Sequence, residues 1–186
     1  MRRLILIVIL LVCAREVRAT VLLPAEFREI VAGSQVIVYG RVAAVRAEWS
    51  DDRTRIDTIV TVTAGSYLKG GPGGTVTFRV PGGQIGRYRN VVVGAPQFQA
   101  GEEAVLFLSA SGGPSIAHVF GLSQGVFRVK VDAQRGTRLV VPPVLMAQGD
   151  GEVPQPVTRG DTTRRQLSLD QFAATVRQAM SSGRAQ

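Results

Sequence analysis

The stretch that decides the fold is Val36–Val45, VIVYGRVAAV, an apolar run that contains a single glycine. Alternating β-branched and polar residues indicate a strand. A glycine inside a strand marks a bulge, or a bend where another backbone comes close. We therefore predict a first long strand that is bent at Gly40.

Further strands follow at short and regular intervals. Ser50–Arg53 is a turn sequence, and the next strands are predicted at residues 56–62, 75–80, 86–93, 116–122, 126–132 and 138–141. Residues 104–108, AVLFL, do not alternate, which predicts a central strand that is buried on both faces. This pattern favours a mainly β protein that forms a small OB-like barrel.

Two helices are expected to flank the strands. Residues 23–33, LPAEFREIVAG, have apolar residues at helical spacing and a final glycine, which predicts a short N-terminal helix. Ser168–Gln171 has the pattern of a capping box, and it begins a C-terminal helix at residues 168–182 whose apolar side chains form one stripe. We expect the stripe to dock on the barrel, or alternatively on a partner protein.

The chain begins with two arginines, an apolar run and the sequence Val17-Arg18-Ala19, which is the pattern of a secretory signal peptide cleaved after residue 19. Cys13 raises the alternative of a lipoprotein, but Val12 is too large for that cleavage signal. Cleavage after Ala19 leaves 167 residues with no cysteine and lowers the net charge from +8 to +5. We predict a secreted or periplasmic protein with no membrane attachment after cleavage.

The predicted organisation is a signal peptide at 1–19, a barrel domain at 20–141, a linker or loose tail at 142–167 and the C-terminal helix at 168–182. The linker prediction rests on its prolines and its lack of periodicity.

The glycine-rich stretch Tyr67–Gly83 contains a lysine and invites comparison with a phosphate-binding loop. Such a loop places its lysine after the last glycine and continues into a helix. Here Lys69 precedes the glycines of residues 70–74, and a predicted strand follows them. The glycines are therefore interpreted as a turn.

The motifs VIVYGRV, IDTIVTV, YLKG and QAGEEAVLFL occur in an order that resembles the OB-type barrel of netrin-like domains, which include the tissue inhibitors of metalloproteinases. Together with EWSDD and PGG, they also resemble a group of uncharacterised exported bacterial proteins. The resemblance covers about residues 36–131. The metalloproteinase inhibitors chelate zinc through an N-terminal cysteine, which this chain lacks after cleavage, so inhibition by that route is not expected.

Few residues have a pattern typical of catalysis. His118 is the only histidine, and a strand histidine is ordinarily a surface or partly buried residue. Glu102 and Glu103 are neighbours before a strand, and neighbouring strand residues point to opposite sides. Asp51, Asp52 and Asp57 lack the spacing of a calcium loop and are interpreted as turn residues of a hairpin. No catalytic residue, metal site or cofactor is predicted.

Basic and aromatic residues suggest a ligand surface instead. OB-type barrels bind ligands by combining basic grooves with stacking aromatic rings. The candidate ligand-binding residues are Trp49, Arg53, Arg55, Arg87, Tyr88 and Arg89, with Arg79 nearby; the alternative is a basic face that only aids solubility.

The sequence therefore predicts an exported, non-enzymatic binding module for an exported protein or an anionic polymer, and export argues against a nucleic-acid partner. The alternatives are a hydrolase with an unrecognised site and a protease-inhibitor-like module.

Overall fold

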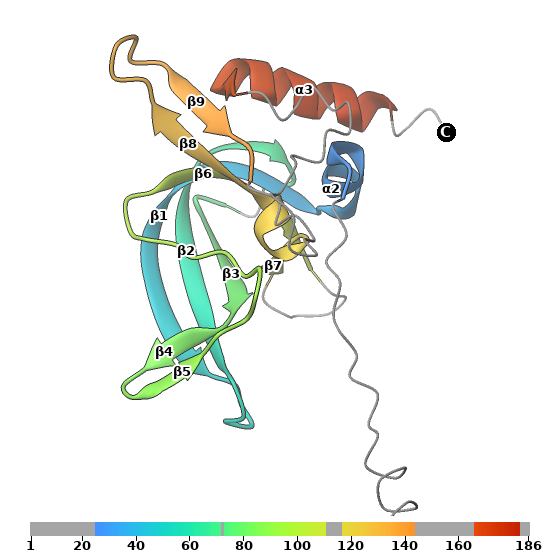
Figure 1. Cartoon of the computed structure of the whole chain (residues 1–186). Helices are drawn as coiled ribbons and strands as arrows, with labels where there is room; N and C mark the ends of the chain where they lie inside the picture. The colour runs from blue at the N-terminus through green and yellow to red at the C-terminus, as the bar shows by residue number, and fades with distance from the viewer. Residues whose placement is uncertain (1–24, 72, 111–116, 144–165, 183–186) are drawn as a thin grey trace, which may run out of the picture.

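A computed structural model describes residues 25–71, 73–110, 117–143 and 166–182. The described chain is mainly β, as predicted, with one short helix near its start and one helix near its end (Figure 1). The predicted signal peptide and nearly all of the predicted linker lie outside the described residues.

Five strands close into a barrel. Strand β1 (Val36–Trp49) pairs with β2 (Ile56–Lys69), β2 pairs with β3 (Thr75–Pro81), and β3 pairs in parallel with β7 (Ala117–Val119). Strand β6 (Glu103–Ser109) then pairs with both β7 and β1, which closes the ring. Closure leaves the paired parts of these strands without a free edge. The OB-like barrel predicted from the sequence is confirmed.

Gly40 lies at the predicted irregularity. The register of β1 against β2 shifts between Tyr39 and Gly40. A Cβ atom at Gly40 would lie 2.5 Å from the carbonyl oxygen of Thr63 and 2.5 Å from Cγ1 of Val62. The close approach of β2 therefore requires glycine here, and the bulge bends β1 into the barrel.

Buried side chains form two clusters on opposite sides of the barrel wall. Val38, Leu106 and Phe78 fill the barrel interior. Ile37 and Phe107 are buried outside it, beneath the helices. Strands β1 and β6 are thus covered on both faces over part of their length, which confirms the prediction for residues 104–108 and explains their unbroken apolar run.

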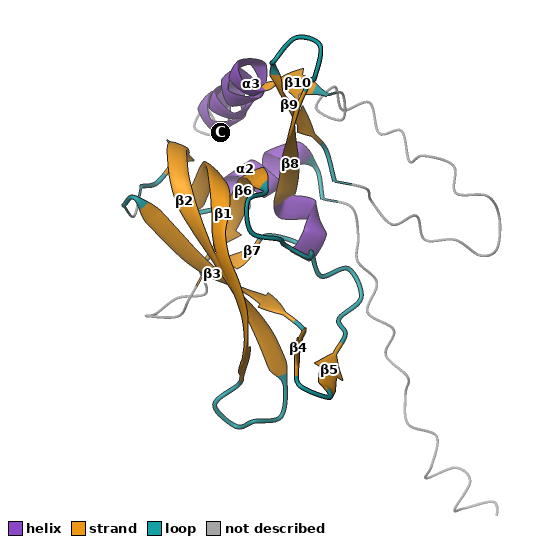
Figure 2. Cartoon of the chain, turned by 90° about the vertical axis from the view of Figure 1, so that its left-hand side faces the viewer, coloured by secondary structure: helices purple, strands orange, loops and turns teal. Residues whose placement is uncertain are grey.

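The outer cluster holds the two helices against the barrel. Helix α2 (Phe27–Gly33) contributes Phe27, and helix α3 (Leu169–Ser182) contributes Phe172 and Val176, which are 1% and 0% exposed. Figures 1 and 2 show α3 over the end of the molecule formed by β8 (Val126–Val131) and β9 (Arg138–Val141). The apolar stripe of the C-terminal helix therefore docks on its own barrel.

The entry to α3 has the predicted capping box. The backbone N–H of Gln171 donates to Oγ of Ser168 over 3.2 Å, and the N–H of Ser168 donates to Oε1 of Gln171 over 3.0 Å. Leu167, which the sequence assigned to the linker, instead forms with Ser168 a short strand β10 (Leu167–Ser168) that pairs with β9.

Lys69 has a structural role at the end of α2. Its Nζ donates to the carbonyl oxygens of Val31 and Ala32, at 2.9 and 3.4 Å. A cation at this end satisfies carbonyl groups that have no partner within the helix. This contact accounts for the lysine in the glycine-rich stretch without a bound phosphate.

Four predicted strands differ in extent or form. Strand β1 runs to Trp49, further than predicted, because its hairpin with β2 extends past the barrel. At its other end β2 runs on to Lys69, which pairs with Ile37 near the start of β1. The single strand predicted at 86–93 is wrong: the chain forms a hairpin of β4 (Gly83–Ile85) and β5 (Tyr88–Asn90). The strand predicted at 116–122 is shorter, because the 3₁₀ turn η1 (Leu122–Gly125) follows β7.

Candidate ligand-binding site at the β4–β5 end of the barrel

The β4–β5 hairpin folds back beside the β1–β2 hairpin. Gly86, with φ of 57°, is the first residue of its two-residue loop, a position that favours glycine. The N–H of Gly82 donates to the carbonyl of Ile56 over 3.1 Å, and Oγ1 of Thr58 donates to the carbonyl of Gly82 over 2.6 Å. These bonds bring the β1–β2 hairpin, where the predicted ligand residues Trp49, Arg53 and Arg55 lie, beside the β4–β5 hairpin, which holds residues 87–89 (Figure 1).

Trp49 and Tyr88 meet where the two hairpins adjoin. Their ring centroids are 5.6 Å apart in an edge-to-face arrangement, and the side chains remain 38% and 51% exposed. The guanidinium of Arg87 lies over the Tyr88 ring, 5.1 Å from its centroid, and its Nη2 donates to the Tyr88 hydroxyl over 3.1 Å. The ring contact restrains Arg87 while leaving most of its N–H groups free for a ligand.

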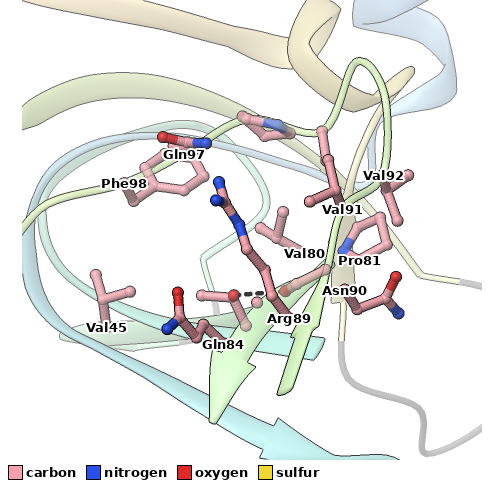
Figure 3. Close-up of a pocket in the computed structure, with 15 residues that line it drawn as sticks. Val45, Val80, Pro81, Gln84, Arg89, Asn90, Val91, Val92, Gln97 and Phe98 are labelled. Carbon is pink, nitrogen blue, oxygen red and sulfur yellow. Dashed lines mark hydrogen bonds between the residues drawn. The ribbon is translucent and has the colours of Figure 1, made fainter. Parts of the chain in front are cut away.

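A cleft of about 280 Å³ lies between the β4–β5 hairpin and the following loop. Figure 3 shows the Arg89 side chain reaching across this cleft towards Gln97 and Phe98. The walls combine valine side chains with amide groups and carry no aspartate or glutamate; the lining is Val45, Thr58, Val80, Pro81, Gly82, Gly83, Gln84, Arg89, Asn90, Val91, Val92, Ala95, Pro96, Gln97 and Phe98.

The far wall of the cleft is held by Arg128 of β8. Its Nη1 donates to Oε2 of Glu102 and its Nη2 to the carbonyl of Gln97, both over 2.5 Å. The same guanidinium lies 5.8 Å from the ring centroid of Phe98, and on the barrel side Phe98 makes an edge contact with Phe78. Because Phe98 is 8% exposed, it closes this end of the barrel and forms the floor of the cleft.

The arginines of the candidate site fall into two groups. Arg55 and Arg79 pair with the carboxylate of Asp57, at 3.5 and 3.3 Å. For Arg87 and Arg89, by contrast, no ion pair is formed with any carboxylate of the described chain. These two guanidinium groups are therefore available to an anion, as is that of Arg53, which also forms no ion pair within the described chain.

The acidic residues near the β1–β2 turn have different structural roles. Asp52 is a turn residue, as predicted, and hydrogen bonds from the Ser50 and Thr54 hydroxyls lower its pKa to about 2. Arg53 adopts the left-handed conformation in this turn, with φ of 54°. The prediction that Asp57 belongs to the turn is wrong: it lies in β2 and is 4% exposed.

Glu102 and Glu103 point to opposite sides, as predicted for neighbours in a strand. Glu102 accepts from Arg128, whereas Glu103 accepts from the Tyr39 hydroxyl over 2.7 Å, from Arg138 Nε over 3.0 Å and from Arg41. The hydrogen bond from Tyr39 is the main cause that lowers the pKa of Glu103, and Arg138 adds to it. Burial, and then the bond to Glu103, raises the pKa of Tyr39.

His118 lies on the outer surface of the barrel and is exposed. Its Nε2 is 3.2 Å from Oγ of Ser109, its partner in the β6–β7 pair. Neither residue lines the cleft. No group of three or more potential metal ligands occurs among the described residues.

The sequence places the ligand-binding loops at residues 49–55 and 81–96, a range that includes the lining residues Gln84, Val91 and Val92. Gln97 and Phe98 lie just outside that range and were interpreted only as loop residues. Their meeting depends on the fold-back of the hairpin and on the Arg128 contacts, which join segments far apart in the chain. In the sequence, the only indication that this loop lines a cleft was Phe98, a large apolar residue in an otherwise polar loop.

No helix in the described part of the chain is both long and apolar enough to span a membrane. Comparisons with protein-family models, curated proteins and solved structures gave no match.

Proposed function

We propose that the protein is an exported, non-enzymatic binding module whose ligand site is the β4–β5 end of the barrel. The observation that carries the proposal is a cleft that is open to solvent, contains a guanidinium and carries no carboxylate in its lining. A cationic group that is not paired within the described part of the chain favours an anionic ligand. The partner is thus an exported protein or another polymer that presents carboxylate or phosphate groups.

The aromatic pair beside the cleft supports the same site. Trp49 and Tyr88 remain partly exposed although their rings are held in contact, and Tyr88 helps to fix Arg87. Rigid aromatic side chains with partial exposure, adjoining arginines, are frequent at protein binding sites. The hydrolase alternative has less support, because His118 and Ser109 lie outside the cleft.

Trp49 provides a direct test, because it is the only tryptophan of the chain and belongs to the site. The protein, expressed from its complete coding sequence, is titrated with poly-L-glutamate, with alginate and with neutral dextran while Trp49 emission is recorded. We expect a saturable change with at least one of the anionic polymers, none with dextran, and weakening of the effect as salt is raised.

The matched variants are Arg89→Gln in the cleft and Arg135→Gln in the β8–β9 turn. Both remove one positive charge, and the two positions lie towards opposite ends of the molecule (Figure 1). Arg89→Gln should weaken binding of the anionic polymer and Arg135→Gln should not. Equal weakening by both would mean that net charge alone attracts the polymer, which refutes a site at this end.

A further inference from the structure

We propose that the partner is an extended, acidic peptide segment that adds to the open edge of β5 as a third strand and places side chains in the adjoining cleft. This inference deepens the proposed function and rests on it. The features that carry it are a backbone edge without a partner strand among the described residues, two exposed valines that follow this edge, and the guanidinium groups of Arg87 and Arg89, which form no ion pair within the described chain.

Among the described residues, the sheet of β4 and β5 has two strands, so β5 has a free side there. Ile85 and Tyr88 close the two-residue loop, and Gly83 pairs with Asn90. In antiparallel hairpins the pair that closes such a loop is hydrogen-bonded, and bonded and non-bonded pairs alternate. The N–H and C=O groups of Arg89 therefore point away from β4, towards the free side.

The free edge continues past the strand. No hydrogen bond to the N–H or C=O of Val91 is formed within the described chain. Val91 directly follows β5 and is two residues beyond Arg89, so an added strand that continued the pairing past Asn90 would meet its backbone groups next. Figure 2 shows β5 at the outer margin of the molecule, with no other described strand or helix beyond it. Such an edge can accept a further strand.

The side chains along this edge suit a peptide. Val91, directly after β5, is 67% exposed, and Val93, in the turn that follows, is 77% exposed, so the two valines offer apolar contacts beside the edge. Gln84 and Arg89 pair across the hairpin, share a face, and both line the cleft. Alternate side chains of an added strand would point to that same face, with apolar walls and a guanidinium to receive them.

Charge complementarity distinguishes between occupants. A second copy of this chain, paired edge to edge, would bring the Arg87 and Arg89 groups of both copies together, and like charges directly across strands are destabilising. An acidic polysaccharide would pair with the arginines but would leave the free peptide groups and the valines without partners. An acidic peptide satisfies all three features, with aliphatic side chains against Val91 and carboxylates near Arg89.

The test begins with a display library of random octapeptides, from which peptides that bind the full protein are selected. Binding of each selected peptide is then measured by Trp49 emission. We expect selected peptides to alternate aliphatic residues with aspartate or glutamate. Each selected peptide is then resynthesised as two series, one with N-methyl groups on its odd-numbered residues and one with N-methyl groups on its even-numbered residues. Methylation in the phase that faces β5 should weaken binding about tenfold or more, because it removes edge hydrogen bonds, whereas the other phase should not.

A variant of the protein tests the same contact from the other side. Val91→Pro removes an N–H group that has no partner in the described chain, and Val91→Thr keeps it in a similar shape. We expect Val91→Pro to bind the selected peptide about tenfold more weakly than Val91→Thr, with equal thermal stability of the two variants as the control. If Val91→Pro proves less stable than Val91→Thr, only the methylated peptides test whether the peptide pairs with the edge of β5.

Three outcomes overturn the inference. Equal binding of both methylated series would show that the peptide does not pair with the edge. Failure to select any peptide, while alginate still alters Trp49 emission in an Arg89-dependent way, would leave a site for acidic polysaccharide and refute the peptide. No response to any peptide or anionic polymer would refute the proposed function as well, and would mean that the arginines only protect the edge from aggregation.

Discussion

Replacing Phe172 by alanine tests whether helix α3 belongs to the folding unit of the barrel. Phe172 is 1% exposed, and its ring centroid lies 5.0 Å from that of Phe127, 5.7 Å from Phe27 and 6.3 Å from Phe107. Truncation of a buried phenylalanine costs about 3–5 kcal/mol, a sum of lost transfer free energy and the cavity left behind. The surroundings here come from three separate segments, so little collapse into the cavity is expected.

The expected loss is a large part of the stability of an ordinary domain, which is about 5–15 kcal/mol. A domain of this size loses roughly 3 °C in Tm for each kcal/mol, so Tm should fall by about 10 °C. Urea unfolding followed by Trp49 emission measures the loss, because Trp49 is the last residue of β1, and this end of the β1–β2 hairpin lies at the opposite end of the molecule from α3 (Figure 1). A lower midpoint at Trp49 shows that barrel and helix unfold together.

The control for this prediction is Arg177→Ala, an exposed position on the same helix. Its effect should stay within about 0.5 kcal/mol. The reasoning is refuted if Phe172→Ala unfolds at the same urea concentration as Arg177→Ala. It is also refuted if the helical signal is lost at low urea while the Trp49 transition does not move, because α3 would then be an independent segment.

Three further substitutions test other parts of the structure. Gly40→Ala should destabilise the protein by about 1–3 kcal/mol in urea unfolding, because the new Cβ meets the Thr63 carbonyl at 2.5 Å. Glu103→Gln should lower the free energy of unfolding at neutral pH, because the pKa of Glu103 is lowered in the folded state. The stabilisation by the Glu103 carboxylate is therefore fully present above the unfolded pKa of about 4.3 and is lost as pH falls through the folded pKa. Arg128→Lys should speed amide hydrogen exchange in residues 97–101, since one ammonium group cannot replace both guanidinium contacts.

Each of these has an outcome that would contradict it. Gly65→Ala is the comparison for Gly40, because its Cβ would be 3.1 Å from ring atoms of Tyr39 rather than from backbone, and a larger loss there would be inconsistent with the bulge. For Glu103→Gln, the stability difference from the parent must shrink on acidification; a constant difference between pH 7 and pH 3 would mean that the carboxylate is not stabilised by its partners. Unchanged exchange in Arg128→Lys would show that Arg128 does not hold the cleft wall.

The sequence by itself determined the parts of the protein that depend on local patterns. The unbroken apolar run at 104–108 identified a strand with two buried faces, because burial acts directly on side-chain period. The Val36–Val45 stretch identified β1 as a strand, but not that its first part is also covered on both faces, where the adjacent Ile37 and Val38 are both buried. The Ser168–Gln171 pattern located the start of α3, because a capping box uses only residues within one helical turn. Gly40 identified the bend in β1 for the same local reason.

Only the tertiary structure decided the candidate site. Six candidate residues could be named from composition, but the sequence could not show that Asp57 pairs with Arg79, because that contact depends on the register of β2 against β3. Nor could it show that Arg87 and Arg89 form no ion pair within the described chain. The cleft needs Phe98 from a loop, Val80 from β3 and Arg89 from β5 to converge, with Arg128 of β8 behind them. Contacts between residues so far apart in the chain arise from barrel closure and leave no local signal in the sequence.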